Sequence, residues 1–188
     1  EPVGEIVAAG KQAHSVKPGD RVVVEPTVSC GHCEFCLVGA HNNCTRSYFM
    51  GSPQAEGFFR DFAIVPEHNV TLVPEDFTDQ RATLIEPIAV MVNMFDKTPV
   101  RPGDTVAVMG AGPIGMLTAA MARMAGASRV FIADKVPHRL KLAREMGADV
   151  TIHNATEAIA PAILDETRGR GVDVTFDAAA SAETINAG

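Results

Sequence analysis

Positive charge and long apolar runs are both scarce in this sequence. Lys and Arg number 16 against 23 Asp and Glu, which gives a formal net charge of −7. A deficit of basic residues argues against a nucleic-acid-binding face and against an anionic membrane surface as partner. No apolar run is long enough to span a bilayer, and no basic segment followed by an apolar one opens the chain. We therefore expect no nucleic acid and no membrane among the partners and, without an export signal, a cytoplasmic protein.

An initiator methionine is also absent. The sequence starts at Glu1-Pro2 and stops at Ala187-Gly188, where a helix is expected to begin, so we expect a fragment or an incompletely represented chain. Its 188 residues suggest one or two domains and suffice for a sizeable core. Apolar residues at 46% and charged residues at 21% are ordinary for a globular protein.

The first part of the sequence is typical of β-structure. Apolar runs predict strands at 3–9, 21–25, 62–65 and 70–73, and the last two are each closed by a proline. The stretch from Thr27 to Ser52 has little periodicity, and an insert of that length in a compact domain needs a function or an internal cross-link. A helical pattern then starts near Thr78 and resumes over 84–96.

The second part alternates between strand and helix patterns. Strands are predicted at 105–109, 129–133, 150–152 and 172–176, and helices at 113–125, 137–146, 156–168 and after Ser181. Strands separated by helices of this length imply a parallel sheet with right-handed crossovers. The composition changes near 88–100, so we expect two domains, at 1–88 and 89–188.

All four cysteines lie in the aperiodic stretch, as Cys30, Cys33, Cys36 and Cys44. Their spacing, C-x2-C-x2-C-x7-C, lets one loop wrap a tetrahedral zinc ion that takes four thiolates. Because four thiolates leave no open position, the lobe at 30–44 is predicted to hold a structural zinc. Two disulfides are an alternative that a reducing compartment disfavours. An iron–sulfur cluster is another, and its common spacings differ from this one.

A glycine-rich loop, Gly110-Ala111-Gly112-Pro113-Ile114-Gly115, separates the strand at 105–109 from the helix that follows. In a dinucleotide-binding unit Gly110 would permit the tight turn, Gly112 would let the backbone approach a pyrophosphate, and Gly115 would let helix and strand pack closely. Pro113 suits a first helical turn, where its missing N–H costs nothing. The free N–H groups and the positive end of the helix dipole would hold the phosphates.

An acid ends the next predicted strand, because Asp134 lies 19 residues after Gly115. At this position a carboxylate accepts from the ribose hydroxyls and repels a 2′-phosphate, so NAD is favoured over NADP. Lys135 and Arg139 keep the alternative open, since a nearby cation can accommodate that phosphate. A lone GxGxxG is a weak signal, but strand, glycine loop, helix, strand and acid in this order predict a dinucleotide site.

The four-cysteine lobe in a β domain, followed by the glycine loop and an acid-ended strand, resembles the zinc-dependent medium-chain dehydrogenase/reductase family. Further matches lie at 1–7, 17–22, 57–65 and 86–87. The resemblance implies a GroES-like β domain with a zinc lobe, followed by a Rossmann-type doubly wound parallel sheet. It covers the middle of a family member, because the region with the catalytic zinc's cysteine and histidine is absent at the start. It also implies NAD, a structural and a catalytic zinc, and a homo-oligomer, either dimer or tetramer.

Within that family, Leu84-Ile85-Glu86-Pro87-Ile88-Ala89-Val90 resembles the polyol branch and is similar to sorbitol, xylitol and idonate dehydrogenases. Carried over residue by residue, Glu1 would be a ligand of the catalytic zinc. Glu86 would sit at that zinc, as a ligand or through its water, and touch the substrate, and Phe49 would line the substrate pocket. The NAD-contacting positions match Ile114, Asp134 and Arg139. Without the resemblance, Glu86 is explained as a first-turn helix acid favoured by the dipole, and Glu1 as a terminal residue without a role.

The sequence therefore predicts an enzyme, a zinc-dependent and NAD-linked dehydrogenase that oxidises a secondary alcohol of a polyol or sugar acid. Zinc with an open position would polarise the hydroxyl and stabilise the alkoxide that gives its hydride to the nicotinamide. A carboxylate at the metal would tune its charge and relay the proton. One alternative is a threonine-type or simple-alcohol-type dehydrogenase. The other, for these residues alone, is a non-catalytic zinc- and nucleotide-binding fragment, and we expect the 188 residues by themselves to show no turnover.

Overall fold

The computed structural model describes all 188 residues, from Glu1 to Gly188. The chain forms two units, Glu1–Pro87 and Ile88–Gly188, each with its own buried apolar clusters. No helix in either unit combines the length and the apolar character that crossing a bilayer needs.

The first unit contains two small antiparallel sheets. Its three-stranded sheet has the order β1-β2-β5 and is made of β1 (Val3–Glu5), β2 (Arg21–Val24) and β5 (Val70–Leu72). The second sheet pairs β3 (Thr27–Val28) with β4 (Tyr48–Phe49). Short helices lie between these strands, namely α1 (Glu34–Leu37), η1 (His41–Asn43) and η2 (Glu67–Asn69), and α2 (Asp79–Ala82) follows β5. The sequence pattern did not predict β3 and β4, which are only two residues long and are set by pairing across the cysteine stretch.

The strand predicted at 62–65 does not form. None of these four residues makes a backbone hydrogen bond, and the side chains of Phe62 and Ile64 are 72% and 100% exposed. An extended segment becomes a strand only where a neighbouring strand offers N–H and C=O groups in register, and no strand pairs with this one. The prediction was wrong because an apolar run does not supply a pairing partner. The strand predicted at 3–9 is shortened to Val3–Glu5, where its pairing with β2 ends.

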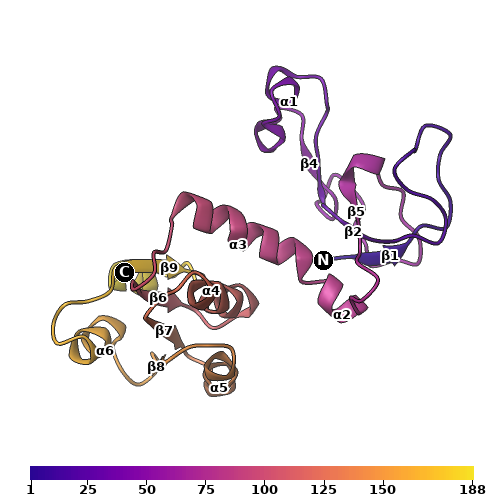
Figure 1. Cartoon of the computed structure of the whole chain (residues 1–188). Helices are drawn as coiled ribbons and strands as arrows, with labels where there is room; N and C mark the ends of the chain where they lie inside the picture. Colours follow the sequence, from indigo (N-terminus) through magenta and orange to yellow (C-terminus); the bar gives the residue numbers. More distant parts are fainter. The chain divides into compact units, whose positions relative to one another are not determined.

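The second unit is built on a four-stranded parallel sheet (Figure 1). Its strands lie in the order β8-β7-β6-β9 and are β6 (Thr105–Met109), β7 (Arg129–Asp134), β8 (Val150–His153) and β9 (Val174–Asp177). The chain runs outward from β6 to β8 and then returns to the other side of β6. The strand order therefore reverses at β6, and ligands of such sheets bind in the crevice at the carboxyl ends of the strands at this point. The glycine loop follows β6 and so lies at that crevice.

Helices cover both faces of this sheet. On one face, alternate strand residues pack against α4 (Pro113–Met124), α5 (Pro137–Glu145) and the second half of α3 (Ile85–Lys97). There the ring of Phe95 in α3 stacks on Phe176 in β9, with centroids 5.0 Å apart. On the other face the intervening residues pack against α6 (Ile159–Glu166) and the end of α7 (Ala182–Ala187). This two-sided burial explains why the two central strands, β6 and β7, are nearly continuous apolar runs.

The strands and helices predicted beyond residue 104 all form, with shifted ends. The largest shift is at α6, which was predicted at 156–168 and spans Ile159–Glu166. Pro161 is tolerated only in the first turn of a helix, so it fixes the start at Ile159. Arg168 has a left-handed φ of 55°, which ends the helical stretch.

Candidate functional site

The four cysteines converge on one point. Their sulfur atoms all lie within 4.8 Å of one another, and the sulfur of Cys36 is 3.9 Å from that of Cys30 and 3.5 Å from that of Cys33. Four sulfurs placed about 2.3 Å from a tetrahedral zinc ion lie about 3.8 Å apart, so the cluster has the dimensions of a zinc site. All four are free thiols, and these separations far exceed the about 2.05 Å of a disulfide bond.

Backbone amides point at the sulfur atoms of this cluster. The N–H groups of Cys30 and Arg46 donate to the sulfur of Cys44 at 3.3 and 3.4 Å, and they lower the pKa of that thiol. The N–H of Cys36 lowers the pKa of the Cys33 thiol to about 6, whereas burial raises the pKa of the Cys36 thiol to about 11. Zinc binds the thiolate form, so the amides aimed at Cys33 and Cys44 prepare two of the four sulfurs for the metal.

His32 braces the lobe and is not a ligand. Its Nδ1 lies 2.6 Å from the carbonyl oxygen of Cys30, and its Nε2 lies 2.9 Å from the guanidinium of Arg46. A guanidinium only donates, so Nε2 accepts and Nδ1 donates its proton to the carbonyl. This imidazole therefore links the two ends of the cysteine loop.

The glycine loop has the backbone geometry that the motif predicts. Gly110 has a φ of +100°, a backbone angle that residues other than glycine rarely adopt. A Cβ on Gly115 would lie 1.8 Å from the carbonyl oxygen of Gly110, so only glycine allows this approach of helix and turn. A Cβ on Gly112, in contrast, would meet nothing within 4 Å, which leaves open space in front of the loop.

Three backbone amides of the loop have no partner, those of Gly112, Ile114 and Gly115. Pro113 is the first residue of α4 and Gly112 its N-cap, without a side-chain cap. Free amides at the positive end of a helix dipole form a site for an anion. Together with the open space at Gly112, these donors fit a pyrophosphate.

Asp134 is fixed beside this loop. Its Oδ2 accepts from the N–H of Ala111 at 2.7 Å and its Oδ1 from the N–H of Val136 at 2.8 Å. A guanidinium nitrogen of Arg139 lies 3.9 Å from Oδ2. Each carboxylate oxygen has two lone pairs, so both retain capacity for a hydroxyl donor. The bond from Ala111, which sequence reasoning missed, places the acid against the loop.

Asp177 is a second acid at this edge that the sequence analysis did not single out. Its Oδ1 accepts from the N–H groups of Ala179 and Ala180 and shapes the turn after β9. That turn touches the glycine loop, since a Cβ on Gly110 would lie 3.2 Å from the Cβ of Ala179. The sequence signal that could have identified Asp177 is its position directly after a predicted strand, which resembles the position of Asp134.

Glu1 and Glu86, which are predicted for a catalytic zinc, do not lie in any group of three or more His, Cys, Asp or Glu side chains that could hold a metal ion. The carboxylates of Glu1 and Glu86 make no hydrogen bond or ion pair, and Glu86 lies in the first turn of α3. Phe49 ends β4 with 53% of its surface exposed. Their roles therefore remain predictions from the sequence.

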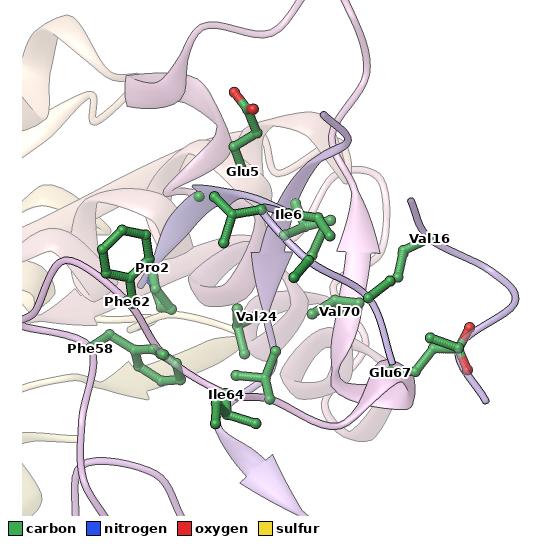
Figure 2. A pocket seen from close by; sticks show the side chains of 18 of the residues that line it. Pro2, Glu5, Ile6, Val16, Val24, Phe58, Phe62, Ile64, Glu67 and Val70 are labelled. Atoms are coloured by element: carbon green, nitrogen blue, oxygen red, sulfur yellow. The ribbon is translucent and has the colours of Figure 1, made fainter. Parts of the chain in front are cut away.

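A cavity of about 440 Å³ lies in the first unit, between β1, β2 and the segment 58–65 (Figure 2). Figure 2 shows the Glu5 carboxylate directed away from the apolar side chains of Ile6, Val24 and Ile64. The cavity is lined by none of the residues predicted to hold metal, nucleotide or substrate. It therefore contributes nothing to the assignment of chemistry.

Fold and site together define a protein with a thiolate metal lobe in a β unit and a nucleotide crevice in a doubly wound unit. Two family descriptions match, "Alcohol dehydrogenase GroES-like domain" over residues 1–75 and "Zinc-binding dehydrogenase" over residues 113–188. The chain belongs to the zinc-dependent medium-chain dehydrogenase/reductase family. Its first unit is the GroES-like domain of that family, and its second is the Rossmann-type domain.

Three similar proteins illustrate the match. A sorbitol dehydrogenase of Bacillus subtilis is 37% identical over 179 residues, which are 95% of this chain and 51% of that protein. A structure from Sinorhizobium meliloti, described as a zinc-binding dehydrogenase bound to NADP, has a TM-score of 0.89 at 31% identity and covers 97% of this chain and 54% of its own. An alcohol dehydrogenase from Escherichia coli in complex with NADH has a TM-score of 0.85 at 36% identity, with coverages of 95% and 52%. The chain thus spans about half the length of each of these three proteins.

Proposed function

We propose that this chain is part of a zinc-dependent dehydrogenase that oxidises a secondary alcohol of a polyol or sugar acid with NAD as hydride acceptor. The observation that carries the proposal is the crevice at β6, where three unpartnered amides face open space beside the fixed carboxylate of Asp134. Nucleotide binding there is supported by two structural neighbours, whose descriptions name NADP and NADH.

In this proposal the chain's own residues bind and orient the nucleotide. The amides of Gly112, Ile114 and Gly115 donate to the pyrophosphate. Asp134 accepts from the hydroxyls of the adenosine ribose, and Arg139 stands beside it with its guanidinium 3.9 Å from Oδ2. Asp134 is held in place by two backbone amides before any ligand arrives, so little ordering cost remains when the nucleotide binds.

The zinc lobe has a structural role in this proposal. The sulfurs of Cys30, Cys33, Cys36 and Cys44 would take all four positions of the ion. Such a site organises a loop that has no core of its own, because only Cys36 and Cys44 are buried between residues 30 and 44. Closed structural sites contribute folding energy rather than chemistry.

The alcohol chemistry is assigned to Glu1, Glu86 and Phe49 on the resemblance to the family. A catalytic zinc held there supplies Lewis acidity toward the substrate hydroxyl. Glu86 would accept a hydrogen bond from the substrate or its bound water and pass the proton on, and Phe49 would contact the carbon chain. Polyols as substrates are supported by the segment Leu84–Val90 and by the name of the Bacillus relative.

A panel of alcohols tests the substrate class. Zinc-loaded protein that carries this chain is assayed for NADH formation with sorbitol, xylitol, gluconate, threonine and ethanol. We expect the highest kcat/KM with a polyol or sugar acid. Preference for threonine or ethanol would refute the polyol assignment but not the dehydrogenase assignment, and absence of turnover with every substrate would favour a non-catalytic binding module.

A pair of variants separates the proposed role of Glu86 from a helix-dipole role. Glu86→Gln removes an acid from the first turn of α3, and Glu34→Gln removes one from the first turn of α1. If Glu86 acts at the metal, its variant loses activity at least about 100-fold, the usual scale for a group that assists proton transfer. The Glu34 variant is expected to keep its activity, and equal small losses in both would show that Glu86 serves only the helix.

A further inference from the structure

One carboxylate joins the chain segments that follow three of the four parallel strands. Glu183, in the first turn of α7 after β9, has Oε2 2.8 Å from the ammonium of Lys135, which follows β7. Its Oε1 accepts from the amide of Asn154, which follows β8, at 3.0 Å. The hydrogen bonds from Lys135 and Asn154 lower the pKa of Glu183, so the carboxylate is charged at neutral pH. This contact lies at the carboxyl edge of the sheet, where the nucleotide is proposed to bind.

Lys135 directly follows the proposed ribose acid, Asp134, and its ammonium forms no other ion pair. The second cation of this neighbourhood, Arg139, stands 3.9 Å from the carboxylate of Asp134. Each of the two cations therefore faces an acid. Asp134 accepts from two amides and faces Arg139, so a second acid beside it would add to its repulsion of a further phosphate.

NADP differs from NAD by a phosphate on the 2′ oxygen of the adenosine ribose, and a nearby cation is what accommodates it. We propose that Glu183 is a specificity-determining residue of this nucleotide site, because its pairing with Lys135 withholds that cation from a 2′-phosphate and adds a second negative charge. The inference rests on the proposed function of the glycine loop and Asp134. It names the residue that would set the choice between two cofactors that structural neighbours bind.

Binding titrations test this without any turnover. The purified chain is titrated with NADH and with NADPH, and the fluorescence of the reduced nicotinamide is followed, which is simple because the chain has no tryptophan. Glu183→Gln keeps the size of the side chain and removes its charge. We expect the affinity for NADPH relative to NADH to rise about two- to fivefold, the scale of one exposed charge pair. Added salt should reduce the rise.

The matched control is Glu166→Gln. Glu166 also pairs with a cation, the guanidinium of Arg129, but at the amino edge of the same sheet. Glu166→Gln changes the net charge by the same amount as Glu183→Gln, but we expect it to leave the ratio of NADPH to NADH affinity unchanged. Adding Lys135→Gln to Glu183→Gln should abolish the gain, because the freed cation is then missing. If Glu183→Gln does not fold, Asn154→Ala is the second variant, because it removes the hydrogen bond that Asn154 donates to the Glu183 carboxylate. We expect it to raise the ratio of NADPH to NADH affinity by a smaller factor.

An unchanged ratio in folded Glu183→Gln would overturn the inference, and so would an equal rise in the Glu166 variant. In either case NADH binding by the unmodified chain would leave the proposed function standing. If the unmodified chain bound neither nucleotide, the proposed function itself would fail first.

Discussion

Removal of one zinc ligand should lower the free energy of unfolding of the first unit, by an amount that depends on the length of the loop that the zinc closes. In Cys44→Ser the metal loses one of four thiolates, and the segment from Cys30 to Cys44 is no longer closed into a loop. A cross-link that closes a loop of about 15 residues stabilises a fold by about 3 kcal/mol. Little else holds this segment, since Leu37 and Val38 are 74% and 78% exposed. For a unit of this size, 1 kcal/mol shifts the melting temperature by about 4–8 °C, so 3 kcal/mol predicts a decrease of about 12–24 °C.

The assay combines zinc analysis with thermal unfolding. The unmodified chain should carry one zinc ion per chain at this lobe, and a chelator should lower its melting temperature to that of Cys44→Ser. Ser47→Ala is the matched control, because Ser47 donates to the carbonyl of Cys44 at 3.0 Å but offers no sulfur; it should keep its zinc. A Cys44 variant that retained full zinc, or an unmodified chain that melted identically with and without chelator, would refute the reasoning.

Three further perturbations follow from the backbone and from one carboxylate. Ala180 has a left-handed φ of 51°, so Ala180→Gly should stabilise the second unit by about 0.5–1 kcal/mol in chemical denaturation; a loss of stability would contradict this. Gly115→Ala would place a methyl group 1.8 Å from the carbonyl of Gly110, and it should destabilise the second unit by about 3 kcal/mol or more and abolish NADH binding. Glu67 accepts from Ser15, and these bonds lower its pKa from 4.5 to about 2. Its stabilisation is therefore complete above pH 4.5 and lost as the pH falls toward 2. Glu67→Gln should be less stable than the unmodified chain at pH 7 but equal to it near pH 2, and a difference that did not change with pH would exclude this role.

The second unit was predictable because its signals are local. The strands β6 and β7 are apolar runs buried on both faces, and each is followed by a helix that starts with a proline, Pro113 or Pro137. Phe62 and Ile64 show the limit of such patterns, since they form an apolar run that stays irregular without a strand to pair with. Strand formation depends on the neighbour as much as on the run itself.

The metal lobe and the nucleotide loop were also predictable, because spacing alone brings Cys30 and Cys44 or Gly110 and Gly115 together. Contacts between distant segments were not. Lys135 and Glu183 are far apart in the sequence and meet only because β7 ends, and the helix after β9 begins, at the same edge of the sheet. The sequence indicated that Lys135 could accommodate the 2′-phosphate of NADP, but it did not indicate that Glu183 pairs with this lysine.

The most direct test of the account is a label-transfer experiment on the zinc-loaded protein that carries this chain. A polyol with deuterium on the carbon of the reacting hydroxyl is incubated with NAD, and the NADH formed is examined by mass spectrometry. Direct hydride transfer predicts one deuterium on the nicotinamide ring for each molecule of NADH. NADH without deuterium, or no NADH from any polyol or sugar acid, would contradict the proposal that this family member oxidises such an alcohol by passing its hydride to NAD.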